Sequence, residues 1–160
     1  MKSIAVIERV LRSGVLLSEM LIVPCRGATS EELASEQELL GISLCSEHIT
    51  LLRRWNGIGL DVLRLFGCGV HSSKVGRLSD LQVPSIQGRR GGLVIGTDPA
   101  GFVYSQEASG SIWQLDTDSG ARKQVAPSMD DWLGRVVFGE GASEFGGLEW
   151  VEELRKAHLL

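Results

Sequence analysis

The chain has 160 residues, 43% of them hydrophobic and 22% charged, which is too apolar for a disordered protein. A single domain of this length buries roughly 70% of the surface that its unfolded form exposes. Sixteen basic and 20 acidic side chains give a net charge of −4, so the basic excess typical of nucleic-acid binding is missing. We therefore expect no nucleic-acid partner, and we interpret Arg53-Arg54 and Arg89-Arg90 as a solvated helix face and a charged loop.

The sequence shows neither a membrane span nor a secretion signal. No segment approaches the ~20 apolar residues that cross a bilayer. A signal needs an uncharged apolar stretch of about 7–15 residues, whereas the longest uncharged stretch before Glu19 is residues 13–18. The three cysteines form no C-x-x-C pair, which argues against a disulfide framework. We expect a cytoplasmic protein without a membrane partner.

Two helices are predicted in the first quarter of the chain. Apolar residues recur at spacings of three and four over residues 3–20, which indicates an amphipathic helix. Thr29 and Glu32 have the spacing of a capping box, in which each side chain bonds the other residue's backbone N–H. A second helix is therefore expected from this box to Gly41, because glycine commonly follows the end of a helix.

A third helix is predicted to start within residues 43–46 and to run to Trp55. Glu47 falls on the side expected to face solvent. Asn56 and Gly57 are expected to end the helix, because both residue types tolerate the left-handed conformation of a helix C-cap.

The centre of the chain changes to a strand-like pattern. The apolar run 60–66 indicates a short strand, and residues 71–92 have the glycines and serines of a loop. Short runs rich in β-formers then follow at intervals of about ten residues, separated by Gly, Pro or Asp turns, and indicate an antiparallel meander. These runs are Leu93–Ile95, Phe102–Tyr104, Ile112–Leu115 and Val125–Ala126.

Helical signals return after Pro127. Ser128 precedes Asp131 by three residues, as in a capping box, and apolar residues follow. Residues 139–147 are glycine-rich and are predicted to form a loop before a last helix, which has its acids early and its bases late. The fold class expected is α+β: a central antiparallel sheet (meander) with helices from both chain ends packed mainly on one face.

The sequence offers no recognisable catalytic centre. It contains no G-x-S-x-G motif, its histidines lie far apart, and residues 88–92 lack the G-K-[ST] ending of a phosphate loop. Asp116 with Asp118, and Asp130 with Asp131, fall in a turn and a first helical turn, where aspartate is structurally favoured. We predict no catalytic residues and no cofactor; a hydrolase with dispersed catalytic groups is the alternative.

One alternative involves a metal. Cys45 with His48, and Cys68 with His71, form two C-x-x-H pairs whose four side chains are of zinc-ligand types. Their spacing departs from the usual zinc pattern, and buried cysteines also serve as small hydrophobic residues. Our prediction is no metal site, with zinc at these four residues as the alternative.

Several stretches between residues 29 and 137 form a recognisable series by their order and spacing: Glu36-x-x-Leu39-x-Gly41-x-x-Leu44, Leu52-Arg53-Arg54-Trp55-Asn56-Gly57, Leu93–Asp98 with Gly101, Leu115–Gly120, and Met129–Leu133. This series resembles the SUKH superfamily, which is named after a fungal regulator of cell-wall synthesis. Cys45 departs from the family pattern, which has proline there, and residues 71–92 have no assigned counterpart.

The resemblance implies one SUKH-like domain over residues 1–160, with its best match at 29–137 and helical extensions at 1–28 and 138–160. Many members of the superfamily are bacterial immunity proteins that bind and neutralise a toxin, often a nuclease or a deaminase. Others are regulatory binding modules. We therefore expect a non-enzymatic protein-binding domain, most simply an immunity protein for a bacterial toxin; the alternative is a cytoplasmic regulatory or scaffold module. The motif residues themselves are interpreted as structural.

The partner-binding residues are expected in the variable parts of the chain. The candidates are the loop 71–92, the strand edge at Gln106 and Glu107, and the acidic turn at Asp116 and Asp118. An acidic rim of this kind steers a basic partner, such as a basic nuclease, by complementary charge.

Overall fold

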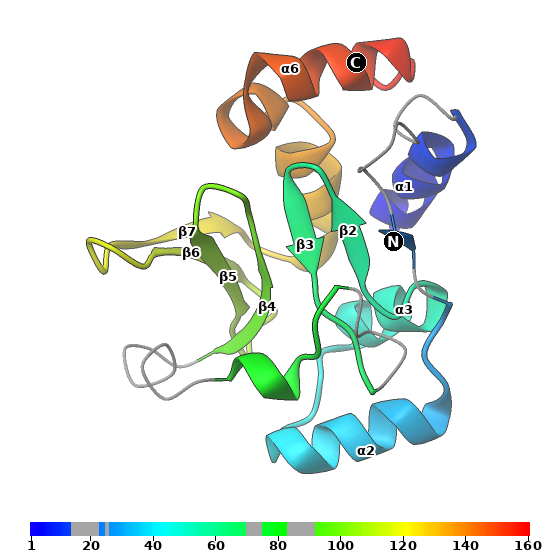
Figure 1. Cartoon of the computed structure of the whole chain (residues 1–160), viewed down its shortest axis with the longest axis vertical. Helices are drawn as coiled ribbons and strands as arrows, with labels where there is room; N and C mark the ends of the chain where they lie inside the picture. Colours follow the sequence, from blue (N-terminus) through cyan, green and yellow to red (C-terminus); the bar gives the residue numbers. More distant parts are fainter. Residues whose placement is uncertain (14–22, 25, 70–74, 83–91) are drawn as a thin grey trace.

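The computed structural model describes residues 1–13, 23–24, 26–69, 75–82 and 92–160. Within them, seven strands form one antiparallel sheet in which each strand pairs with the next along the chain (Figure 1). The predicted meander is therefore confirmed, and it extends further toward the N-terminus than expected. The strands are β1 (Val23–Pro24), β2 (Ile58–Leu60), β3 (Leu63–Leu65), β4 (Leu93–Thr97), β5 (Phe102–Gln106), β6 (Ile112–Asp116) and β7 (Arg122–Ala126).

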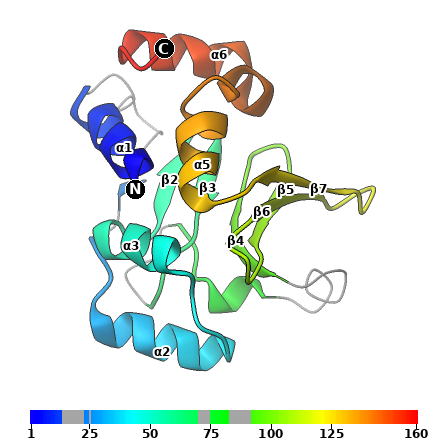
Figure 2. The same cartoon turned by 180° about the vertical axis from the view of Figure 1, so that it is seen from behind.

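Helices from both ends of the chain meet on one face of this sheet. The segment made of α5 (Met129–Asp131) and the π-helix η3 (Trp132–Val137) lies over β2 and β3 (Figure 2), and helix α3 (Ser46–Arg54) contacts α5. Helices α1 (Lys2–Ser13) and α6 (Ala142–Lys156) both pack against η3. This arrangement confirms the predicted α+β class.

Helix α2 (Ser30–Leu40) lies at the end of the molecule opposite α6, and it begins and ends as predicted (Figure 1). The backbone N–H of Glu32 donates to Thr29 Oγ1 at 3.1 Å, and that of Thr29 donates to Glu32 Oε2 at 2.8 Å. Gly41 ends the helix with φ 66°, and its N–H donates to the carbonyl of Glu38. The capping box and the glycine thus set both ends of α2.

Two carboxylates cap helices that are distant in sequence. The N–H groups of Met129 and Asp130 donate to Glu47 Oε2 at 3.0 and 3.3 Å, so α3 caps α5. Asp130 in turn accepts from the N–H groups of Lys2 and Ser3 at 3.1 and 2.8 Å, so α5 caps α1. We call this the capping relay. Glu47 is half-buried and serves this role, whereas the sequence placed it in solvent.

Asn56 and Gly57 follow α3, as predicted, but they do not both take the left-handed conformation that was expected of them. Only Gly57 takes a left-handed conformation, with φ 92°. The fully buried Asn56 side chain instead clamps Cys68: Nδ2 donates to the Cys68 carbonyl at 2.6 Å, and Oδ1 accepts from the Cys68 N–H at 2.5 Å. The clamp ties the end of α3 to the end of β3.

Two boundaries differ from the sequence prediction. The run 60–66 belongs to a hairpin, because Asp61 and Val62 form a turn between β2 and β3. Within the predicted loop 139–147, α6 already begins at Ala142, although Gly147 interrupts it with φ 77°. Gly146 is needed for packing, since a Cβ there would lie 2.8 Å from the Trp150 side chain. None of the helices in the described part of the chain is long and apolar enough to cross a membrane.

Candidate functional site

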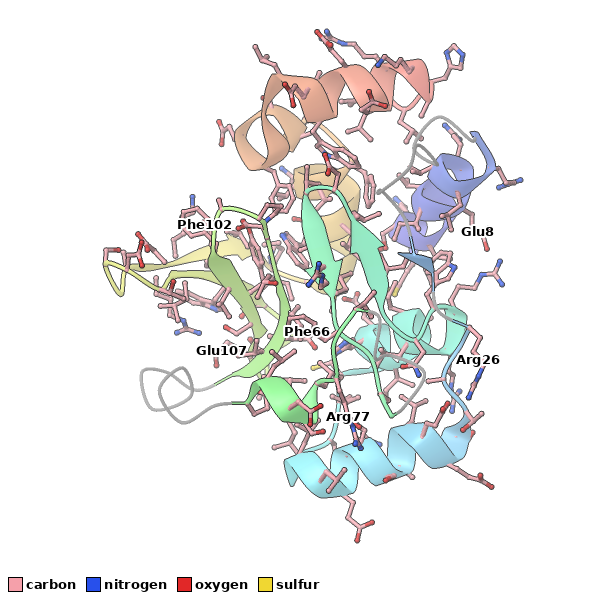
Figure 3. All side chains as sticks on the ribbon, in the orientation of Figure 1. Glu8, Arg26, Phe66, Arg77, Phe102 and Glu107 are labelled. Atoms are coloured by element: carbon pink, nitrogen blue, oxygen red, sulfur yellow. The ribbon has the colours of Figure 1, made fainter. Side chains whose placement is uncertain are left out.

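The four predicted partner-binding residues lie at opposite ends of the β5–β6 hairpin. Gln106 pairs with Ile112 at one end, and Phe102 pairs with Asp116 at the other. Four residue steps along a strand separate the two pairs by about 13 Å. Figure 3 shows the labelled Phe102 and Glu107 toward opposite ends of β5. The structure therefore keeps Gln106 and Glu107 together but does not bring them together with Asp116 and Asp118.

At the β6–β7 turn, the Asp116 side chain accepts hydrogen bonds from the residues of the turn itself. Its carboxylate accepts from the N–H groups of Asp118 and Ser119 at 2.9 and 3.2 Å, and from Ser119 Oγ at 2.6 Å. The hydrogen bonds from Ser119, followed by that from Asp118, hold the pKa of Asp116 below its usual value. Asp116 therefore shapes the turn, while Asp118 is the exposed acid there.

At the other end of the hairpin, Gln106 is 4% exposed, and its Nε2 donates to the Gly110 carbonyl at 3.5 Å. Glu107 is partly exposed and forms an ion pair with Arg122. The Arg122 guanidinium lies over the Trp113 ring, 4.1 Å from its centroid. Gln106 is thus a structural residue, and Glu107 belongs to a charged and aromatic cluster on the surface.

The proposed zinc ligands were Cys45, His48, Cys68 and His71, of which His71 lies outside the described residues. Cys45 begins α3, and its Sγ donates to the Glu107 carbonyl at 3.9 Å. His48 is 2% exposed, and burial lowers its pKa to about 4. Burial, together with the charge of Glu36, raises the pKa of Cys68 to about 12. Among the described residues, no three His, Cys, Asp or Glu side chains form a group that could hold a metal ion.

A surface hollow of about 250 Å³ lies between the α2–α3 connection and the β5–β6 hairpin. Gly41 allows the chain to turn after α2, and the Leu44 N–H donates to Gln37 Oε1 at 2.8 Å, which fixes the connection. The contact between Cys45 and Glu107 holds the hairpin against it. The walls are mainly apolar and are formed chiefly by Leu40, Ile42, Leu44, Leu93, Glu107 and Ala108.

Two large apolar side chains near the end of α2 are exposed, and one of them, Ile42, lines this hollow. Leu39 is 61% exposed and Ile42 is 45% exposed, although large aliphatic side chains are normally buried. The sequence contained a signal for Leu39: it lies off the helical face that carries Leu33, Glu36 and Leu40 inward. The sequence analysis placed Leu39 only within a family-like motif and did not identify it as a surface residue.

A second hollow, of about 460 Å³, lies between the sheet and the start of α6. The polar side chains Asp98, Tyr104 and Gln114 in its lining are hydrogen-bonded within the protein. The Tyr104 hydroxyl donates to Asp98 Oδ2 at 2.7 Å and accepts from Gln114 at 3.0 Å, and the Phe102 N–H donates to Asp98 Oδ1 at 3.0 Å. Burial, and then the hydrogen bond to Asp98, raises the pKa of Tyr104. Asp98 therefore shapes the β4–β5 turn, as the sequence predicts.

No protein-family model and no curated protein matches the chain.

Proposed function

We propose that this chain is a non-enzymatic protein-binding domain, specifically a SUKH-type immunity protein that binds and neutralises a bacterial toxin. The observation that carries the proposal is the use of the inward-facing carboxylates. Each of them accepts hydrogen bonds from backbone N–H groups of another element or of its own turn. The carboxylates are those of Glu36, Glu47, Asp98 and Asp130.

A general acid or base must reach a substrate proton within hydrogen-bonding distance. Glu36 is the one fully buried carboxylate of the four, and it is poorly placed for that role. Its side chain has no exposure, and it accepts from the N–H groups of Gly69 and Ser79 at 3.3 and 2.8 Å and from Arg77 Nε at 2.9 Å. Figure 3 shows Arg77 reaching toward α2 to make this pair. The acids of the interior thus hold the fold together.

The surface supports the binding role. Apolar side chains that protrude beside a hollow are typical of a protein-interaction site. Ile42 has this placement: it lines the first hollow and is 45% exposed. The SUKH-like motifs add the narrower assignment, because many members of that superfamily neutralise toxins.

The test is co-expression with the toxic C-terminal domain of a secreted protein encoded immediately upstream of this chain's gene. We expect cells that make both proteins to grow, and the two chains to co-purify as a stable complex. The control pairs the toxin with an unrelated immunity protein, which gives no rescue. Continued killing in the presence of the folded chain overturns the immunity assignment and favours a regulatory or scaffold module that binds a cellular protein.

A further inference from the structure

We propose that Asn56 is a deamidation site that the native fold protects, and that its conversion to aspartate or isoaspartate prevents an unfolded chain from returning to the native structure. Asn56 is the only asparagine in the sequence, and glycine follows it. The reaction needs no partner protein, because it depends only on Asn56, Gly57 and water.

The reaction joins the Asn56 side chain to the backbone that follows it. After hydroxide removes its proton, the Gly57 nitrogen bonds to Asn56 Cγ. The Cγ–Nδ2 bond then breaks, and Nδ2 leaves as ammonia with a proton taken from water. A water molecule opens the cyclic imide at one of its two carbonyls, which gives aspartate or isoaspartate at position 56. In a flexible chain an Asn-Gly pair is especially prone to this reaction, because glycine has no Cβ to hinder the attack.

The native structure restrains each of the reacting groups. The Gly57 N–H donates to the Trp55 carbonyl at 2.8 Å. The Asn56 amide is held at both polar atoms, since Nδ2 donates to the Cys68 carbonyl at 2.6 Å and Oδ1 accepts from the Cys68 N–H at 2.5 Å. Asn56 has no exposure, and Gly57 is buried as well. The attack therefore requires the clamp between Asn56 and Cys68 to open and water to enter.

Aspartate at position 56 does not rebuild the clamp. An ionised carboxylate accepts hydrogen bonds but donates none. An oxygen would replace Nδ2 opposite the Cys68 carbonyl, so two acceptors would face each other in the interior. Leaving a buried carbonyl without its donor is costly, and burying a charge in place of a neutral amide costs more.

Isoaspartate does not fit the space around the clamp. It inserts a methylene into the main chain before Gly57, whose surroundings are closed: a Cβ added to Gly57 would overlap the Val75 side chain and lie 3.2 Å from the Leu65 carbonyl oxygen. Gly67 closes the other side, since a Cβ there would lie 2.7 Å from Asn56 Oδ1. Both products thus disrupt the link between α3 and β3.

Time spent unfolded is thereby converted into permanent loss. A domain of ordinary stability is unfolded for roughly one part in a thousand of the time or less, and deamidation of the native chain is slowed accordingly. Chains that stay unfolded react at the full rate and leave the pool that can fold.

The experiment compares the full chain in native buffer with the full chain in guanidinium chloride, both at pH 8 and 37 °C with a reductant for the three cysteines. Mass spectrometry of the tryptic peptide 55–64 follows the replacement of the amide by a carboxyl group. We expect steady conversion in the denaturant and a rate lower by roughly a hundredfold or more in native buffer. Comparable rates under the two conditions overturn the proposed protection.

Two variants test the chemistry in the denaturant, where their ability to fold does not matter. Gly57→Val places a branched side chain beside the attacking nitrogen and is expected to slow conversion by roughly tenfold or more. The matched control is Gly59→Val in the same peptide, which is expected to leave the rate unchanged. Conversion that is equally fast in both variants overturns the assignment to the Asn56-Gly57 pair.

Refolding tests the consequence. Chains are diluted from the denaturant after increasing times, and near-ultraviolet circular dichroism gives the native fraction. We expect this fraction to fall in step with deamidation at pH 8. After equal times in denaturant at pH 5, where hydroxide is scarce, we expect full refolding. Asn56→Asp is expected to lack the native bands, whereas Asp61→Asn, the reverse exchange at an exposed turn residue, retains them. Deamidated or Asn56→Asp chains with the native spectrum overturn the proposal.

Discussion

At the scale of single residues, burial sets the ionisation of His48. The ring is 2% exposed on α3, and its Nδ1 has no hydrogen-bond partner in the described part of the chain. Water is replaced by apolar neighbours that stabilise the cation poorly, so the pKa falls from 6.5 to about 4. The folded protein therefore holds this histidine neutral at pH values where the unfolded chain binds a proton.

The consequence is a loss of stability as the pH falls from 6.5 to about 4. In this window the unfolded state takes up more protons than the folded state, so acid favours unfolding, by as much as about 3 kcal/mol over the window. Urea unfolding of the native chain at pH 7 and pH 4.5 measures the effect. In His48→Leu the pH dependence from this residue is expected to disappear, whereas the exposed His158→Leu retains it.

The pKa of Asp130 is shifted in a way that does not mimic this signal. Partial burial by itself raises the pKa of Asp130, but the hydrogen bonds from Ser3 and Lys2 outweigh it and hold that pKa below the usual 3.8. Stability from Asp130 is therefore lost only as the pH falls below 3.8, under the His48 window. An unchanged slope in His48→Leu between pH 6.5 and 4.5 would show that another group controls the acid response.

At the scale of elements, α2 separates a structural face from an exposed one. Glu36 points inward and holds Gly69 and Ser79 through their backbone N–H groups and Arg77 through its guanidinium. Glu38, two residues later, points outward and is exposed. We therefore expect Glu36 to stabilise the folded protein and Glu38 to contribute little to its stability.

Replacing Glu36 by alanine is expected to destabilise the protein by roughly 3 kcal/mol, because buried N–H groups and the Arg77 guanidinium lose their acceptor. Glu38→Ala is expected to change stability by less than about 0.5 kcal/mol. Denaturant unfolding of both variants gives the comparison. Glu36→Gln, which keeps one acceptor oxygen, is expected to fall between them; equal losses at the two positions would contradict this division.

The sequence predicted the helix ends and turns that are set by residues close to one another along the chain. Thr29, Glu32 and Gly41 act within a few residues of each other, and their spacing alone located both ends of α2. The β4–β7 turns were predictable for the same reason. The partners of Glu47 were not, because Met129 is 82 residues away and no local pattern records that approach.

The candidate site was harder to predict than the fold. Asp116 was predicted to bind a partner because it is acidic, but its carboxylate oxygens accept hydrogen bonds from Asp118 and Ser119 within the turn. Leu39 is aliphatic, as core residues are, and its position off the inward-facing side of α2 was the signal that the sequence analysis did not use. Glycine at 146 indicated a loop because a sequence does not show the close approach of Trp150.

At the scale of the whole molecule, α6 is part of the central packing. Tyr104 from β5, Trp132 from η3 and Phe145 from α6 form an aromatic cluster with centroid distances of 4.9, 5.8 and 6.4 Å. Trp150 packs on Phe138 at 5.7 Å, and its Nε1 donates to the Val137 carbonyl at 2.6 Å. The C-terminal segment that the sequence analysis placed outside the best match thus completes the core.

A chain that ends at Gly141 is therefore expected to lose its fixed tertiary packing, since Phe145 and Trp150 no longer cover Trp132 and Phe138. Near-ultraviolet circular dichroism should lose its aromatic bands, and dye binding should report newly exposed apolar surface. A chain that ends at Ala157 retains both aromatic contacts and is expected to keep the native spectrum. Native bands in the shorter chain would show that α6 is dispensable.

The capping relay also bears on the order in which the protein is completed during synthesis. Helix α1 leaves the ribosome long before α5, yet the carboxylate that caps its first turn belongs to Asp130, 127 residues after Ser3. Domains generally begin to fold from the N-terminal part while the remainder is still being made. Here α1 has to wait for α5, so the nascent chain carries an uncapped, amphipathic α1 until Asp130 has emerged.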